Sequence, residues 1–208
     1  MRNTAFLFAD AVEKQIQALS DKSFHLRKGD AKRLLEEWYP LSRLALHLKQ
    51  PGLEVYVEGF DDKRVADGHI QEIGWRERSF DVQITCVEDE ESALRRQLMQ
   101  LQGHAPGAGH IARDKNSKLI NATMVAVDSN HNLKKAADGV AKCLTSKAAK
   151  SYPANTVLLI AFNDMTLLGF GMWEQLLGLI NTQVGLASSH FASVYVINSA
   201  TNELVKAA

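Results

Sequence analysis

The sequence predicts an α/β fold in which helices flank a mixed central β-sheet. Helical and strand-like patterns follow one another in the order helix, helix, three strands, helix, helix, strand, helix, strand, which is typical of layered α/β folds. The chain has 208 residues, of which 46% are hydrophobic and 23% charged. This is enough for one ordinary core, so we expect residues 1–208 to form a single domain.

Charge and cysteine content restrict the function only loosely. The 24 Lys and Arg residues balance the 24 Asp and Glu residues, so any anionic partner must be held by a local patch. Cys86 and Cys143 lie in apolar contexts without a CxxC partner, which predicts buried thiols in a reducing, cytoplasmic compartment. No stretch approaches the roughly 20 apolar residues of a membrane span, so we expect no membrane association.

Two helices are predicted at the start of the chain. Apolar residues recur at helical spacing over residues 3–19, which read as a helix and not as a signal peptide. Asp30 can cap a second helix over residues 31–49, which ends at Pro51-Gly52. The apolar stripe of this helix falls within one narrow sector and consists of Leu34, Trp38, Leu41, Ala45 and Leu48.

Three runs of strand length come next and predict an antiparallel meander. They are separated by turn-like segments and read LEVYVEGF (53–60), RVADGHIQEI (64–73) and FDVQITCV (80–87). Asp89 can then cap another helix, whose buried stripe would consist of Leu94, Leu98 and Leu101.

The remaining chain predicts a loop, two helices and two long strands. Residues 103–119 are rich in glycine and charge and read as a mobile loop. The apolar run 155–164 has the length and composition of a strand buried on both faces. The other elements are a helix over 130–150 with a lysine-rich surface (Lys134, Lys135, Lys142, Lys147, Lys150), a helix over 167–181, a strand over 191–197 and a hairpin arm over 202–205.

Two aspartates stand where strand interiors are expected, a place that normally disfavours Asp. Alternation of side chains puts Asp81 and Gln83 on the same polar face of the third strand. Hairpin pairing can bring Asp67 of the preceding strand beside Asp81. Two carboxylates that close repel each other unless a cation or a proton lies between them. A hard divalent ion such as Mg²⁺ suits this position, because it takes one or two carboxylates plus water and phosphate oxygens.

A third acid comes from the helix before the meander. On a helical wheel Glu37 falls between Leu41 and Leu44 on the apolar side, whereas Glu36 points away from the apolar stripe. An acid that faces the sheet needs a reason, so Glu37 is a candidate for the same site.

Structural explanations compete with this metal site. A polar sheet face open to solvent carries such residues without any function. Glu37 can be a rim residue that pairs with Arg33 or Arg43. Arg76 and Arg78 can be ordinary charges at the tip of a hairpin.

The order of these elements resembles the restriction-endonuclease-like PD-(D/E)XK superfamily of nucleases. A helix bearing Glu, a strand with AD, a strand with DVQIT and a further helix occur in that order. The resemblance implies a restriction-endonuclease-like core with an added N-terminal helix. It divides the chain into a helical extension (1–30), the motif-bearing core (31–103), a loop-rich insertion (104–129) and C-terminal helices and strands (130–208).

The resemblance also implies which residues form the site. Asp67 matches the aspartate of the PD motif, with Ala66 in place of proline, and Asp81 matches the second acid. Gln83 stands where the superfamily usually has lysine, and Glu37 matches the helix-borne glutamate, although Glu36 is an alternative. The carbonyl group of Val82 would be a metal ligand.

The implied activity is hydrolysis of phosphodiester bonds in nucleic acid, DNA rather than RNA, with Mg²⁺ or Mn²⁺ as cofactor. Asp67 and Asp81 would hold the ion, Glu37 would bind or orient a metal-bound water, and Gln83 would position that water through a neutral amide. The residues that could contact the nucleic-acid backbone are Arg76, Arg78, Arg95, Arg96, Lys134 and Lys135.

Two alternatives to the nuclease remain open. The first is a nuclease-like fold that no longer cleaves and binds nucleic acid or a partner protein, which the glutamine at position 83 and the zero net charge favour. The second is a structural subunit whose apolar final helix docks on a copy of itself in a homodimer, although Trp173 in that helix is more typical of a core residue. Motifs of other enzyme classes, such as GxSxG, the Walker loop and HExxH, do not occur in the sequence.

Overall fold

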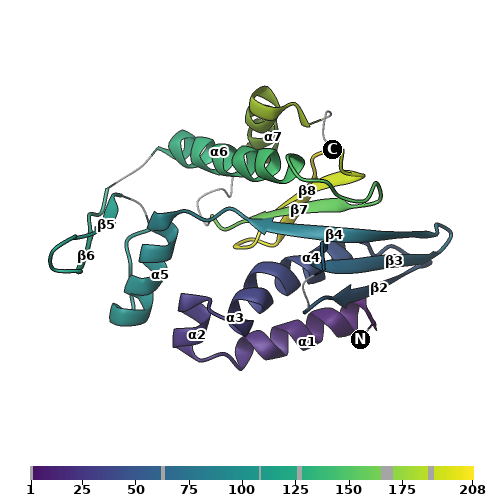
Figure 1. Ribbon diagram of the computed structural model, residues 1–208, viewed down its shortest axis with the longest axis horizontal. Helices are drawn as coiled ribbons and strands as arrows, with labels where there is room; N and C mark the ends of the chain where they lie inside the picture. The colour runs from purple at the N-terminus through teal and green to yellow at the C-terminus, as the bar shows by residue number, and fades with distance from the viewer. Residues whose placement is uncertain (1, 62–63, 108, 126–127, 165–170, 187–189) are drawn as a thin grey trace.

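The computed structural model describes residues 2–61, 64–107, 109–125, 128–164, 171–186 and 190–208. Within these residues the fold is α/β, with a mixed seven-stranded sheet flanked by helices (Figure 1). The helical elements are α1 (Ala5–Gln17), α2 (Asp21–Leu26), α3 (Asp30–Arg33), the π-helical turn η1 (Leu34–Trp38), α4 (Tyr39–Leu48), α5 (Glu90–Gln102), α6 (Ser129–Ala148) and α7 (Met172–Val184). The strands are β1 (Asn3–Thr4), β2 (Leu53–Gly59), β3 (Gly68–Gly74), β4 (Arg78–Cys86), β5 (Ile111–Arg113), β6 (Ile120–Ala122), β7 (Val157–Phe162), β8 (Ser193–Asn198) and β9 (Glu203–Lys206).

The sheet combines an antiparallel and a parallel half. Its described strands follow the order β1-β2-β3-β4-β7-β8-β9. The pairs from β1 to β4 are antiparallel, which confirms the predicted meander, and β4, β7 and β8 run parallel. The terminal strand β9 is antiparallel to β8, as the predicted hairpin arm requires. Strands β5 and β6 form a separate hairpin.

Two hydrophobic layers lie on opposite faces of the sheet. Helices α1 and α4, with η1, cover one face, and α6 and α7 cover the other (Figure 1). Every residue of β7 is buried: Val157, Leu159 and Ala161 belong to the first layer, and Leu158 and Ile160 to the second. The prediction of a strand buried on both faces is therefore confirmed. Among the described residues, no helix is long and apolar enough to cross a membrane.

Several predicted elements differ from the structure at their boundaries. The segment predicted to break the first helix contains α2, where the Ser20 hydroxyl caps the helix by accepting from the Ser23 N–H. The segment predicted as a mobile loop contains β5, which pairs with β6. Leu101 is 66% exposed, because it lies in the last turn of α5 beyond the contacts that bury Leu94 and Leu98.

The predicted helix over residues 31–49 is interrupted by a π-helical turn. The three elements α3, η1 and α4 follow one another without a break, but the hydrogen bonds of η1 join residues five apart. This wider turn ends the regular 100° spacing on which the helical wheel depends. Glu36 is the more buried acid, at 7% exposure, and Glu37 is half-buried. The Glu36 carboxylate lies near the cations of Arg27 and Lys32, so its burial does not place it on the apolar stripe. Such turns occur frequently at functional sites.

Candidate functional site

Asp67 lies where the chain enters β3 and is held by both neighbouring segments. Its backbone N–H donates to the carbonyl of Val82 (3.0 Å), and its own carbonyl accepts from the N–H of Phe60 (3.0 Å). Its carboxylate Oδ2 accepts hydrogen bonds from the N–H of Ile84 (2.6 Å) and from the side-chain amide of Gln83. Because β3 begins at Gly68, Asp67 lies just before the strand and not in its interior. The carboxylate thus closes the end of the β3–β4 pairing.

Asp81 lies on the same face of the sheet, but a histidine stands directly opposite it. The strand register pairs Asp81 with His69 and Val82 with Gly68. The His69 Nδ1 and Asp81 Oδ1 atoms are 2.8 Å apart, and His69 Nε2 lies 2.7 Å from the Ser79 hydroxyl. Asp67 is therefore a diagonal neighbour of Asp81, at a typical separation of roughly 7–8 Å between such positions. The two aspartates share a face as predicted, whereas the adjacent pairing that hairpin geometry allowed is not formed.

Glu37 of η1 lies close enough to Asp67 for the charge of Asp67 to raise its proton affinity. Burial raises the pKa of the Glu37 carboxyl, and the negative charge of Asp67 raises it further. Burial also raises the pKa of Asp67, opposed by the Ile84 N–H, the ammonium of Lys147 and the Gln83 amide. Arg33 lowers the pKa of Glu37, but its guanidinium pairs with Asp30 (2.6 Å), so the rim pair considered as an alternative is not formed with Arg33. Arg43 instead pairs with Glu13.

Lys147 of α6 approaches this acid pair from the other side of the sheet. Burial lowers the pKa of its ammonium, and the charges of Asp67 and Glu37 raise it. In the sequence, Lys147 is one of five lysines expected on the surface of this helix. The signal that distinguishes it is its position, because Lys147 continues the buried stripe of α6 one turn beyond Val140 and Leu144.

Gln83 is buried, at 5% exposure, and both of its amide hydrogens are used. One is donated to Asp67, and the other to the carbonyl of Ile84 (3.0 Å). Gln83 therefore holds the Asp67 carboxylate in place. Only the side-chain amide oxygen of Gln83 could accept a hydrogen bond from a water molecule. The carbonyl of Val82, predicted as a metal ligand, accepts the hydrogen bond from the Asp67 N–H.

The donor set of the site fits an ion that needs few protein ligands. Among the described residues, no group of three or more His, Cys, Asp or Glu side chains is arranged to hold a metal. The acid pair supplies two carboxyl groups whose charges repel, and a cation between them would relieve that repulsion. Mg²⁺ binds through one or two carboxylates and takes its other ligands from water and phosphate. Glu37 and Asp67 suit that donor set.

Several of the cations predicted to contact a nucleic-acid backbone hold the fold together. Arg76 and Arg78 both pair with Glu72, which is 1% exposed: Arg76 Nε lies 2.7 Å and Arg78 Nη2 2.9 Å from its carboxylate. Arg95 donates to the carbonyls of Pro106 (3.1 Å) and Gly109 (2.5 Å), which fixes the segment after α5. Their contacts to nucleic acid stay predictions, and these ion pairs and hydrogen bonds would compete with them.

The other predicted contact residues differ in how strongly they are engaged. Lys135 pairs with Asp89 (2.8 Å) and Glu91 (2.9 Å), and Arg96 pairs with Glu88. Lys134 is exposed on α6. Lys134 could therefore contact a nucleic-acid backbone, as predicted, without breaking the ion pairs of Lys135 and Arg96.

In comparisons with family models, characterised proteins and solved structures, neither the sequence nor the fold matches any of them.

Proposed function

We propose that the protein is a divalent-metal-dependent nuclease that hydrolyses phosphodiester bonds, with DNA as its preferred substrate. The observation that carries this proposal is the convergence of three charged groups from three elements. Glu37 comes from η1, Asp67 from the segment before β3 and Lys147 from α6. The charge of Asp67 raises the pKa of Glu37, both acids raise the pKa of Lys147, and Lys147 lowers the pKa of Asp67. Perturbed pKa values on groups that meet in this way are typical of functional sites.

The order of the core elements supports the same proposal. A glutamate-bearing helical segment precedes the antiparallel strands β2, β3 and β4, and β7 then adds in parallel to β4. This is the element order on which the resemblance to PD-(D/E)XK nucleases was based. Asp67, which the resemblance matches to the motif's aspartate, lies immediately before β3.

Each residue of the site has a distinct role in this proposal. A bound Mg²⁺ or Mn²⁺ would supply an acidified water and stabilise negative charge on the phosphate. Asp67 and Glu37 would hold the ion, and the raised pKa of Glu37 suits it to exchange a proton with a nearby water. The ammonium of Lys147 would supply the positive charge that Gln83 lacks, and Gln83 would keep Asp67 in place.

A second candidate is a catalytically inactive nuclease-like fold that binds nucleic acid or a partner protein. This candidate is favoured by the hydrogen bonds of the Asp67 carboxylate, whose Oδ2 atom already accepts from the Gln83 amide and the Ile84 N–H. In this case Asp67 is a structural acceptor at the end of the β3–β4 pairing, and Glu37 and Lys147 serve only to balance its charge.

A cleavage assay separates the two candidates. The purified protein would be incubated with single-stranded DNA, duplex DNA and RNA in Mg²⁺ or Mn²⁺, alongside Asp67→Asn and Asp81→Asn. We expect cleavage by the wild type and its loss in Asp67→Asn, with unchanged melting temperatures as the control for folding. Cleavage that survives in Asp67→Asn would refute the proposed site, and no cleavage of any substrate would favour the binding module. Loss of cleavage in Asp81→Asn would show that the Asp81 carboxylate also binds the ion, which requires its contact with His69 to break.

A further inference from the structure

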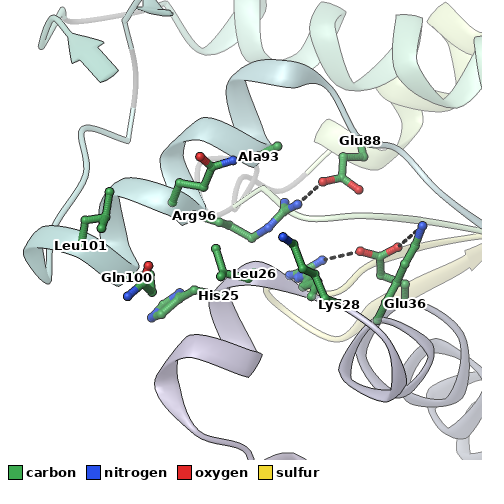
Figure 2. Close-up of a pocket in the computed structure, with 12 residues that line it drawn as sticks. His25, Leu26, Lys28, Glu36, Glu88, Ala93, Arg96, Gln100 and Leu101 are labelled. Carbon is green, nitrogen blue, oxygen red and sulfur yellow. Dashed lines mark hydrogen bonds and ion pairs between the residues drawn. The ribbon is translucent and has the colours of Figure 1, made fainter. Parts of the chain in front are cut away.

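A polar cavity of about 400 Å³ lies between α2 and α5 and is reached by Glu36 of η1 (Figure 2). Its volume falls within the roughly 300–1,000 Å³ of typical ligand pockets. The proposed nuclease site uses Glu37, whereas the cavity uses the neighbouring Glu36. Its charged lining consists of Arg27, Lys28, Lys32, Arg96, Glu36 and Glu88.

The cations of the cavity outnumber its acids. Two arginines and two lysines face two glutamates, which leaves an excess of two positive charges. The pairs with Glu36 are long: Arg27 Nη1 lies 3.8 Å and Lys32 Nζ 4.0 Å from its carboxylate oxygens. Charge-assisted hydrogen bonds typically span about 2.7–2.9 Å. Glu36 therefore balances these cations through space without engaging their donors.

Two of the arginine donors face no acceptor within the described part of the chain. Arg96 pairs with Glu88 through its Nη2 atom, but Arg27 Nε and Arg96 Nε are both buried and without a hydrogen-bond partner there. Burial lowers the pKa of Arg27, and the positive charge of Arg96 lowers it further. A buried donor without an acceptor is unfavourable, so this arrangement is better suited to an additional anion than to a closed ion-pair network.

The backbone at Arg27 is itself unusual. Arg27 ends α2 in the left-handed region, with φ 45° and ψ 56°, which is uncommon for a residue other than glycine. Its side chain contributes to the cavity from that position. A conformation of this kind at a ligand-facing side chain is a reason to examine the position for function.

The two ends of the cavity differ in chemistry. Figure 2 shows Lys28, Glu36 and Glu88 toward one end, and His25, Gln100 and Leu101 toward the other. The charged end suits the several acceptor oxygens of a phosphate group. The second end offers an imidazole, an amide and an apolar side chain, which suit a neutral planar group with hydrogen-bonding edges.

We propose that this cavity binds a nucleoside phosphate, whose phosphate is held by Arg27, Arg96 and Lys28 and whose base lies toward Gln100 and Leu101. The ligand is a free nucleotide or the 5′-phosphorylated end of a nucleic-acid strand. The site is separate from the Asp67 site and does not depend on cleavage there.

The test is calorimetric binding of the four nucleoside 5′-monophosphates in turn, and of a short DNA strand with and without a 5′-phosphate. We expect at least one phosphorylated probe to bind, and the strand without phosphate to bind at least tenfold more weakly. A free nucleotide that binds better than the strand identifies the first source, and the reverse identifies the second. Absence of binding by every phosphorylated probe, or equal binding of both strands, would overturn the proposal.

Two variants and a matched control assign the binding to the cavity. Lys28→Gln and Arg96→Gln should each weaken binding about fivefold or more, because each removes a charged donor. Lys22→Gln makes the same charge change at an exposed position of α2 that does not line the cavity, and should bind as the wild type does. If Lys28→Gln, Arg96→Gln and Lys22→Gln all weakened binding equally, the effect would come from the overall charge of the protein, and the proposed site would be refuted. Asp67→Asn should bind normally, so a failure of the nuclease proposal is distinguishable from a failure here.

Discussion

At the scale of single residues, Lys147 is the side chain on which the proposed chemistry depends most. Removing one preorganised charge from a catalytic site typically lowers the rate about 100-fold or more. We expect Lys147→Gln to slow phosphodiester cleavage by about that factor without changing the melting temperature. Lys142→Gln, at an exposed position of the same helix, serves as the matched control and should retain full activity. Equal rates for both variants would exclude Lys147 from the site.

Glu37 makes stability depend on pH in a definite direction. Its pKa is raised in the folded protein above the ordinary 4.5, so the folded state holds its proton more tightly than the unfolded state. Its contribution to stability is fully present below pH 4.5 and is lost as the pH rises through the raised value. Glu37→Gln should therefore be more stable than the wild type at pH 7, by a margin that shrinks as the pH falls toward 4.5. Urea unfolding at pH 5 and pH 7.5 measures this, and a margin that grows on acidification would contradict it.

At the scale of elements, the cap of α5 is a local determinant of stability. The Asp89 carboxylate accepts from the Ser92 N–H (2.7 Å) and pairs with Lys135, and these bonds lower its pKa to about 2. Asp89→Ala should destabilise the fold by about 1 kcal/mol, the usual effect of losing such a cap. This difference should disappear as the pH falls below the ordinary 3.8 toward 2, where the cap is protonated. Glu90→Ala, exposed in the same first turn, is the control for charge and should have a smaller effect in urea unfolding.

The type and order of the longer elements could be predicted from the sequence, because each of them carries a periodic signal, whereas α2 and β5 were missed. The meander, the cap at Asp89 and the doubly buried β7 all follow from local patterns, and the structure confirms them. The π-helical turn carries no such signal, and the near-complete burial of Glu36 beside Arg27 and Lys32 was not predicted. Strand register is a pairwise property as well, and for that reason the sequence did not predict His69 as the partner of Asp81.

The parts of the site that were missed depend on contacts between distant elements. Lys147 reaches the Asp67 carboxylate only because α6 packs on the face of the sheet that carries Asp81 and Gln83. The cavity with Arg27 and Arg96 forms between α2 and α5, and α2 itself was not predicted. Such combinations become visible only when the tertiary structure is known.

At the scale of the whole molecule, β7 joins the two hydrophobic layers of the fold. Leu159 is fully buried in the first layer, so truncating it to alanine removes contacts and leaves a cavity. Leu159→Ala should lower the free energy of unfolding by about 2–5 kcal/mol. Leu101→Ala makes the same chemical change at a 66% exposed position and should alter stability little. Similar losses in urea unfolding for both variants would contradict this description of the core.

Two clusters of charged residues lie at opposite ends of the β3–β4 hairpin and differ in how well their charges are paired. Arg76 and Arg78 neutralise the buried Glu72 at the far end of the β3–β4 hairpin. Glu37, Asp67 and Lys147 meet at its other end, where the carboxyl groups repel and one ammonium is close. The first cluster is closed by direct ion pairs, whereas the second is the one that a cation would stabilise further.

Binding of Mn²⁺ followed by electron paramagnetic resonance tests this central claim most directly, because it does not require the substrate to be known. We expect one bound ion in the wild type. Binding should be lost or weakened about tenfold or more in both Asp67→Asn and Glu37→Gln, and should be normal in Glu54→Gln at an exposed position of β2. Mn²⁺ binding that is absent from the wild type, or unchanged in the Asp67 and Glu37 variants, would refute the proposed metal site and favour the inactive binding module.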